Sequence, residues 1–311
     1  MNKSNQSISE FLLLGFPDVI GIWATVLFSM ILVIYILTLM INAMVIALVS
    51  TTPQLHSAMY FFLQQLSVVE FMFLTVVVPN MLRVIWLEGA TISVRGCITQ
   101  AYFYCVTGCV ECHLLVVMAY DRYLAICYPL RYNTIMDTRL QNLLLIYCWV
   151  FGLLLTQITL NFLCQLFFCG PNVINHFFCD IIPFAELTCS HKFAYRLMIL
   201  IVSVPLIAIP FILIVVSYIY IFITILGISS TRGRKKTFST CSSHLTVVTM
   251  YYGTLIIIYM VPANGDTLTI NKLIAFLYIV ITPLFNPIIY CLRNHEMRVI
   301  IEKLFIGNNK Q

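Results

Sequence analysis

The segment "CITQAYFYCVTGCVECHLLVVMAYDRY", residues 97–123, contains one charged residue, Glu111, before the pair Asp121-Arg122. The 25 positions from Cys97 to Arg122 span about 37 Å in a continuous α-helix, at about 1.5 Å per residue. That length crosses the hydrocarbon core of a bilayer, which is about 30 Å thick. The segment therefore predicts a membrane-spanning helix with a cysteine at one end and an acid–base pair at the other.

The rest of the chain repeats this pattern. Of its 311 residues, 61% are hydrophobic and only 9% are charged, whereas a soluble domain is about a quarter charged. A water-soluble fold of this size cannot bury so much apolar surface. Six other stretches are long enough to span a membrane and have at most one charge, the mid-span Glu70: residues 19–55, 57–82, 140–179, 197–231, 237–265 and 273–292.

We therefore predict an all-α membrane protein, a seven-transmembrane helix bundle with a short C-terminal interfacial helix. Residues 1–22 are expected to form an extracellular tail, residues 23–292 the helix bundle, and residues 293–311 a cytoplasmic tail. Apolar and charged residues alternate with helical spacing in that last segment, as in a helix that lies in the membrane interface.

Lys and Arg predict the orientation. If the N-terminus is outside, eleven of the seventeen basic residues lie on the inner side, as the positive-inside rule favours. Two N-x-Ser sequons, at Asn2 and Asn5, lie in the tail predicted to be outside and are candidate glycosylation sites. The net charge of +5 is thus a topology signal, and no nucleic-acid partner is expected.

Four of the twelve cysteines, Cys97, Cys169, Cys179 and Cys189, lie in the expected outer regions. An even number in an oxidising compartment indicates disulfides, but the spacing leaves the three possible pairings open. None of these four cysteines has zinc-site spacing, so no metal centre is expected there. The long outer segment around three of them, residues 166–192, can be a lid over a binding cavity or a structural cap, and the sequence favours neither.

Two features carry charge where the membrane makes charge costly. Asp121-Arg122 at the inner end of its helix can be a latch that opens in one state, or an interfacial anchor, and burial energetics alone favour the anchor. Glu70 and Glu111 lie mid-span, where an acid is a candidate functional residue. Two such acids can hold a cation, share a proton or both stay neutral.

Several long motifs together make the sequence similar to one family. "MAYDRYLAICYPLRY" (residues 118–132), "KKTFSTCSSHLTVV" (residues 235–248) and "PLFNPIIYCLRN" (residues 283–294) resemble the vertebrate olfactory receptors, within the rhodopsin-like G-protein-coupled receptors. "LHSAMYFFLQQLS" and "FCGPNVINHFFCD" extend the resemblance, which covers about residues 11–303.

The resemblance implies a function. It implies an odorant receptor in the plasma membrane of olfactory cilia that binds a small volatile and raises cAMP through a stimulatory olfactory-type G protein. A chemoreceptor of the same fold outside the olfactory epithelium is the alternative. No cofactor is expected, and the partners are an odorant, the G protein and membrane lipid.

The resemblance also implies residue roles. It implies disulfides Cys97–Cys179 and Cys169–Cys189, and a sodium-accessible site near Glu70 and Glu111. The residues implied in the activation switch and G-protein coupling are Asp121, Arg122, Tyr123, Tyr218, Lys235, Lys236, His244, Asn286, Pro287 and Tyr290. Ile41 and Ser57-Ala58 depart from the family's usual residues, which affects local packing and not the fold.

The ligand site implied by the family lies in the outer half of the bundle. Matching positions are Tyr104, Cys105, Gly108, Cys109, Val202, Leu206, Tyr252, Tyr259 and Ile279. This set carries phenol and thiol groups and no charge, so we expect a neutral volatile. Each of these residues is equally well explained as interhelical packing.

Other functions lack their signatures. A transporter with inverted repeats would show paired broken helices, and an intramembrane enzyme would show a Ser/His pair, an Asp/Asp pair or an H-E-x-x-H motif in its spans; neither pattern is found. A purely structural membrane protein gives no reason for the motifs at the inner face. The chain is therefore not expected to be an enzyme.

Overall fold

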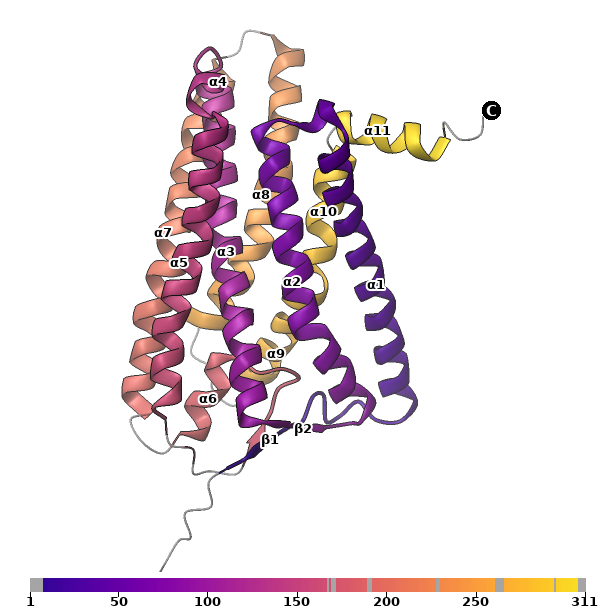
Figure 1. Cartoon of the computed structure of the whole chain (residues 1–311), viewed down its shortest axis with the longest axis vertical. Coiled ribbons are helices and arrows are strands. Elements are labelled where there is room, and N and C mark those ends of the chain that lie inside the picture. Colours follow the sequence, from indigo (N-terminus) through magenta and orange to yellow (C-terminus); the bar gives the residue numbers. More distant parts are fainter. Residues whose placement is uncertain are drawn as a thin grey trace, which may run out of the picture.

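The computed structural model describes residues 8–166, 168, 172–188, 192–227, 230–260, 266–293 and 295–306. The side chains of Lys235, Lys236 and Tyr290 are outside this described set, although the helices that carry them are within it. Long helices lie side by side along the long axis of the molecule (Figure 1). A small sheet covers one end, here called the sheet end, and helix α11 (His295–Ile306) leaves the opposite, tail end (Figure 1).

The predicted seven-helix bundle is confirmed. Six spans are long and apolar, and the apolar part of α8, His244–Met260, supplies a shorter seventh. The helices that form the spans are α1 (Ile22–Thr51), α2 (Ala58–Trp86), α3 (Val94–Cys127), α5 (Thr138–Cys164), α7 (Lys192–Leu226), α8 (Thr231–Met260), and α9 (Asp266–Val280) with α10 (Thr282–Arg293). The shorter elements are the 3-10 turn η1 (Pro53–Leu55), α4 (Tyr132–Ile135) and α6 (Ile181–Leu187).

Local sequence explains where two of these helices begin. The Ser93 hydroxyl accepts a hydrogen bond from the Gly96 amide at the start of α3, at 3.1 Å. The Asp137 carboxylate does the same for the Leu140 amide at the start of α5, at 2.8 Å. Both satisfy amides that have no partner within the first turn of their helix. The charge-free run 140–179 overshoots α5, because an apolar connection after Cys164 lacks charge just as a helix does.

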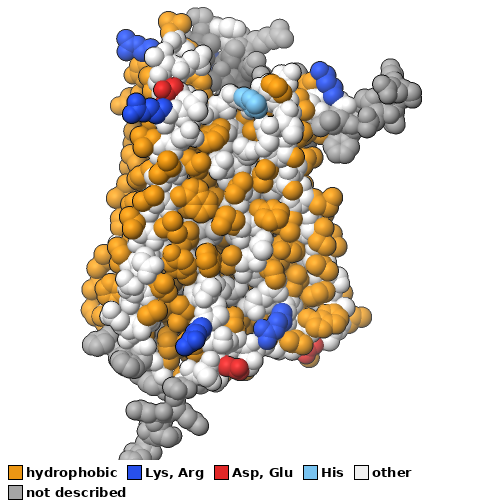
Figure 2. Space-filling model, viewed as in Figure 1, with side chains coloured by type: hydrophobic (Ala, Val, Ile, Leu, Met, Phe, Trp, Pro, Cys, Tyr) orange, Lys and Arg blue, Asp and Glu red, His pale blue; other side chains and the backbone are white. Residues whose placement is uncertain are grey.

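Helix α3 is the centre of the bundle. It is one continuous helix, as predicted, and most of its side chains are buried against its neighbours. By contrast, α1 and α7 expose large apolar side chains along much of their length, as helices that face lipid do. In Figure 2 apolar side chains cover the middle of the molecule, and the charged side chains lie near its two ends.

The sheet end is closed by three short strands. The order is β2-β1-β3, with β1 (Glu10–Leu13) antiparallel to β2 (Ala90–Ser93) and parallel to β3 (Val173–Ile174). Alternate β1 side chains, Phe11 and Leu13, are fully buried under the sheet. Part of the predicted N-terminal tail is therefore the middle strand of a cover over the bundle.

A buried lysine holds this cover to the helices. The Lys272 amine, on α9, donates to the Gly15 carbonyl at 2.7 Å and to the Asn175 side-chain oxygen at 2.6 Å. The Phe16 ring stacks on Phe177 at 5.3 Å between centroids. The N-terminal segment, the long connection before α7 and the seventh span are thereby fixed to one another.

Candidate functional site

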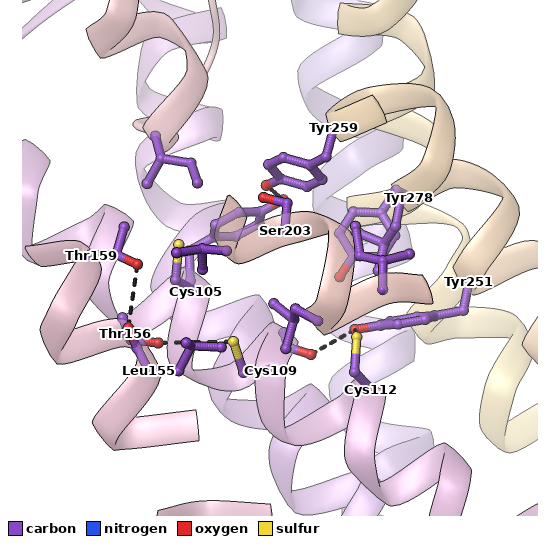
Figure 3. A pocket seen from close by; sticks show the side chains of 17 residues that line it. Cys105, Cys109, Cys112, Leu155, Thr156, Thr159, Ser203, Tyr251, Tyr259 and Tyr278 are labelled. Atoms are coloured by element: carbon purple, nitrogen blue, oxygen red, sulfur yellow. Dashed lines mark hydrogen bonds between the residues drawn. The ribbon is translucent and has the colours of Figure 1, made fainter. Parts of the chain in front are cut away.

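A cavity of about 60 Å³ lies inside the bundle toward the sheet end (Figure 3). Its walls come from α3, α5, α7, α8 and α9, and Ile181 of α6 contributes from the sheet end. Tyr251, Tyr259 and Tyr278 lie along one side of it in Figure 3, with Cys112 next to Tyr251. The other side is formed by Cys105, Cys109, Thr156 and Thr159. The lining is mainly apolar with a few hydroxyl and thiol groups, as is typical of small-molecule sites.

Seven of the nine residues predicted for the ligand site line this cavity. They are Tyr104, Cys105, Gly108, Cys109, Val202, Leu206 and Tyr259. A Cβ added at Gly108 would lie 3.9 Å from the Tyr278 hydroxyl, so the glycine leaves space on the α3 wall. Sequence reasoning therefore found the α3 and α7 walls.

The structure places the other two predicted residues, Tyr252 and Ile279, outside the lining. The Tyr252 ring packs on Phe211 at 5.6 Å, and its hydroxyl donates to the Cys112 carbonyl at 2.9 Å. Their chain neighbours Tyr251 and Tyr278 line the cavity instead. One position along a helix rotates a side chain by about 100°, so a small error in helix phase moves a residue off the wall.

Polar groups on α5 and α7 were also missed. Thr156, Thr159 and Ser203 line the cavity and are buried. The Thr156 hydroxyl lies 3.9 Å from the Cys109 sulfur, and the Thr159 hydroxyl donates to the Leu155 carbonyl at 3.3 Å. Thr156 and Thr159 are three positions apart in a charge-free apolar run and so lie on one face of the helix, which is the sequence signal that could have indicated this wall.

Tyr251 ties α8 to α3 at the cavity. Its hydroxyl donates to the Gly108 carbonyl at 2.8 Å, and the Cys112 thiol points to the same hydroxyl at 3.5 Å. These contacts join two helices that also reach the tail end of the bundle. A molecule in the cavity would therefore contact a bond between them.

Above the cavity lies an acid that the predicted set did not include. Asp180 is 4% exposed, and both its carboxylate oxygens lie 3.1 Å from the Tyr259 hydroxyl. Its Oδ1 also accepts from the Ile181 amide at 2.6 Å, and the Tyr259 hydroxyl lies 3.2 Å from that of Tyr104. The predicted set itself carries no charge, and Asp180 adds a carboxyl group directly behind it. An acid next to an expected disulfide cysteine, in "FFCDII", was the available signal.

Asp180 gives the sheet end a pH dependence. Burial raises its pKa from 3.8 to about 6, against the lowering effect of its bonds to Ile181 and Tyr259. The native state binds this proton more tightly than the unfolded state does, so stability falls as the pH rises from about 4 to about 6. In Asp180→Asn this titration is absent. We therefore expect the thermal midpoint of the purified variant, minus that of the wild type, to increase as the pH rises through this range. A constant difference between the two proteins from pH 4 to pH 7 would contradict the assignment.

The structure contains one of the two expected disulfides. Cys97 at the start of α3 is bonded to Cys179, and the Gln100 side chain accepts from the Cys179 amide at 3.0 Å. This fixes Asp180, the next residue, above the cavity. Cys169 and Cys189 lie outside the described residues, as do Asn2 and Asn5. Phe168 and Thr188, next to those cysteines in the sequence, form an antiparallel bridge.

The tail end contains two contacts among the predicted switch residues. Arg122 is paired with Asp121, and Asp121 Oδ1 also accepts from the Tyr132 hydroxyl at 2.6 Å. On the facing helices, the Tyr218 hydroxyl and His244 Nδ1 are 2.7 Å apart. Tyr123 lies apart from these pairs and packs on aromatic rings at the surface of α3. The side chains of Lys235, Lys236 and Tyr290 lie outside the described set.

The two mid-span acids share one partner. The Asn286 amide donates to Glu70 at 2.5 Å and reaches Glu111 at 3.4 Å, and all three side chains are buried. Pro287 follows Asn286 within α10. The family resemblance implied that the two acids lie together and that Asn286 belongs to the switch. The position of Asn286 between the two acids was not predicted. Within the described ranges no three His, Cys, Asp or Glu side chains are grouped as metal ligands would be.

Comparison with known proteins places these features in context. A family model described as olfactory receptor matches residues 31–308. The chain is 42% identical to human olfactory receptor 6P1 over 98% of its own length and 96% of that protein. It is 43% identical to human olfactory receptor 10A3, over 98% of this chain and 97% of the other. Mouse olfactory receptor 6B9 is 42% identical, over 97% and 95% of the two chains.

Proposed function

Because this chain belongs to the olfactory receptor family, whose members are receptors and not enzymes, we propose that it binds a small neutral volatile compound in the cavity and activates a stimulatory G protein. The observation that carries the proposal is the apolar cavity inside the bundle. Two of the helices that line it, α7 and α8, also carry the contact between Tyr218 and His244 at the tail end. The cavity volume of about 60 Å³ favours compact ligands, because it is smaller than the cavity of about 150 Å³ that is known to bind benzene.

Helix α8 offers a path between the two ends. A ligand that contacts Tyr251 acts on the bond from its hydroxyl to the Gly108 carbonyl of α3. His244, about 10 Å further along the same helix, holds Tyr218 of α7. A ligand that binds better when α8 has shifted will raise the population of bundles open at the tail end. Arg122, 16% exposed and paired with Asp121, would then become available to a G protein.

The orientation and location belong to the same proposal. We place the sheet end outside the cell and the tail end in the cytoplasm, which is consistent with the basic residues concentrated there in the sequence. The receptor would lie in the ciliary plasma membrane, in contact with lipid, with glycans at Asn2 or Asn5 and a second disulfide between Cys169 and Cys189. Sodium near Glu70 and Glu111 would bias the inactive state.

The test is a screen of compact volatiles by cAMP accumulation in cells that express the receptor with the olfactory G protein. Tyr259→Ala removes part of the cavity wall, so it should raise the EC50 of an active compound by about tenfold or more. Tyr252→Phe is the matched control, because it alters a buried tyrosine of the same helix that does not line the cavity. Surface staining of an N-terminal tag verifies delivery. If Tyr259→Ala is surface-expressed and responds like the wild type, the ligand site is elsewhere.

A further inference from the structure

We infer that the line of polar groups formed by Asp180, Tyr259 and Tyr104 makes the cavity selective for volatiles that donate a hydrogen bond, alcohols and phenols above all, over aldehydes, ketones and ethers of the same skeleton. This inference rests on the proposed function and specifies its ligand class. It stands on the geometry at the sheet end of the cavity, where the three groups lie in series at 3.1 and 3.2 Å.

The carboxylate sets the direction of every proton in this line. An ionised carboxylate can only accept hydrogen bonds, whereas each tyrosine hydroxyl has one proton to donate. Tyr259 therefore donates to Asp180, and its proton is used. The Tyr104 and Tyr259 hydroxyl oxygens are 3.2 Å apart. Because the single Tyr259 proton is used by Asp180, we infer that a hydrogen bond between these two hydroxyls takes its proton from Tyr104. Both tyrosines line the cavity, and Asp180 is behind them.

At this end of the cavity, the two tyrosines therefore present hydrogen-bond acceptors to a ligand, and neither has a free hydroxyl proton to donate. The unused lone pairs of the Tyr104 and Tyr259 oxygens can accept from a ligand hydroxyl. A ligand carbonyl or ether oxygen in the same place meets those lone pairs without a donor, and a buried acceptor without a partner loses free energy on leaving water.

Hydrogen bonds from the Ile181 amide and the Tyr259 hydroxyl favour the ionised form of Asp180 and lower its pKa against the effect of burial. The titratable groups that act on it come from three helices: Tyr104 and Cys105 of α3, Tyr195 of α7 and Tyr259 of α8. None of these is a cation, and burial raises the pKa of Asp180 only to about 6. His176 of the same connection does not titrate nearby, because burial lowers its pKa to about 3.

Replacing or protonating Asp180 should reverse the direction of the hydrogen bonds among Asp180, Tyr259 and Tyr104. In Asp180→Asn the amide oxygen keeps the bond from the Ile181 amide, and the NH₂ group replaces Oδ2 and donates to Tyr259. Tyr259 then donates to Tyr104, and the Tyr104 proton becomes available to a ligand acceptor. Protonation of wild-type Asp180 at pH 5 has the same consequence without any substitution, which covers the case of a variant that folds poorly.

The experiment uses the full-length receptor in lipid nanodiscs with propan-2-ol, acetone and 2-methoxypropane as probes, which are smaller than benzene and so suit a cavity of about 60 Å³. Dissociation constants come from the rise of the thermal midpoint with probe concentration. At pH 7.4 we expect the wild type and the Tyr252→Phe control to bind the alcohol about tenfold more tightly than the ketone or the ether. In Asp180→Asn, and in the wild type at pH 5, this ratio should fall to about one or invert toward the ketone.

The outcomes separate the two proposals. Equal binding of the three probes at pH 7.4, or an alcohol preference that survives both Asp180→Asn and pH 5, would overturn the selectivity while leaving the volatile site in place. If no probe stabilises the wild-type receptor at any concentration, both the selectivity and the proposed volatile site fail for compounds that fit this cavity.

Discussion

Arg122→Ala should reduce odorant-evoked cAMP to the level of cells without receptor, while the amount of receptor at the cell surface stays close to that of the wild type. Arg122 pairs with Asp121 at the tail end of α3, and its side chain is 16% exposed whereas that of Asp121 is 1% exposed. The Asp121 carboxylate keeps the bond from the Tyr132 hydroxyl when Arg122 is removed, so the fold around it should persist. The loss should therefore be one of signalling.

Two further variants sharpen this test. Arg139→Ala removes an exposed arginine from the first turn of α5 and is the matched control, which should signal normally. Asp121→Asn weakens the pair from the other side and should raise cAMP without ligand, by several-fold at coupling energies of about 1–3 kcal/mol. If Arg122→Ala signals normally, or if Asp121→Asn lowers basal activity, Asp121-Arg122 is an interfacial anchor and not a latch.

The second large effect is expected from Cys179→Ser. The disulfide to Cys97 closes a loop with a sequence separation of 82 residues, and removing a native disulfide typically costs about 2–5 kcal/mol. Cys179 also precedes Asp180 and donates its amide to Gln100, so its release would free the acid above the cavity. We expect little receptor at the surface and a lowered thermal midpoint in the fraction that is recovered.

Cys164→Ser is the control for this experiment. Cys164 is an exposed free cysteine at the end of α5, so its replacement should leave both surface delivery and the thermal midpoint unchanged. The double variant Cys97→Ser/Cys179→Ser should be no worse than either single variant, because each single variant already breaks the same bond. A single variant with normal stability would show that the sheet end is held by other contacts, those of Lys272 among them.

The spans could be predicted from sequence because each side chain contributes almost independently to the free energy of transfer into the bilayer. A charge-free run of about 20 residues reports on transfer into lipid, and the helix follows since the backbone must satisfy its own hydrogen bonds there. The same signal is silent outside the lipid. It cannot tell the end of α5 at Cys164 from the apolar connection that follows, nor locate the break between α9 and α10 near Ile281.

The candidate site divides in the same way. The predicted residues on α3 and α7, and Tyr259 on α8, line the cavity. Tyr252 and Ile279 do not, and each is one position along the helix from a residue that does. The neighbouring disulfide cysteine Cys179 marked Asp180 as a candidate, but the burial of Asp180 could not be predicted from local sequence, because an acid in a connection is ordinarily solvated. It becomes a buried partner of Tyr259 only when the disulfide brings residues far apart in the sequence together. Strand β1 is likewise too short to be recognised without its two partners.

The middle position of β1 in its sheet has a consequence for the order in which the chain matures. Residues 10–13 leave the ribosome before any span, yet one edge of the strand has no partner until residues 173 and 174 have been synthesised and, in the proposed orientation, moved across the membrane. The first segment made is thus among the last to be fixed, and its buried Phe11 and Leu13 must wait uncovered while four spans are inserted. During that interval one strand edge and two apolar side chains lack the contacts of the finished sheet, so we expect chaperones to bind the N-terminal segment until the sheet is complete.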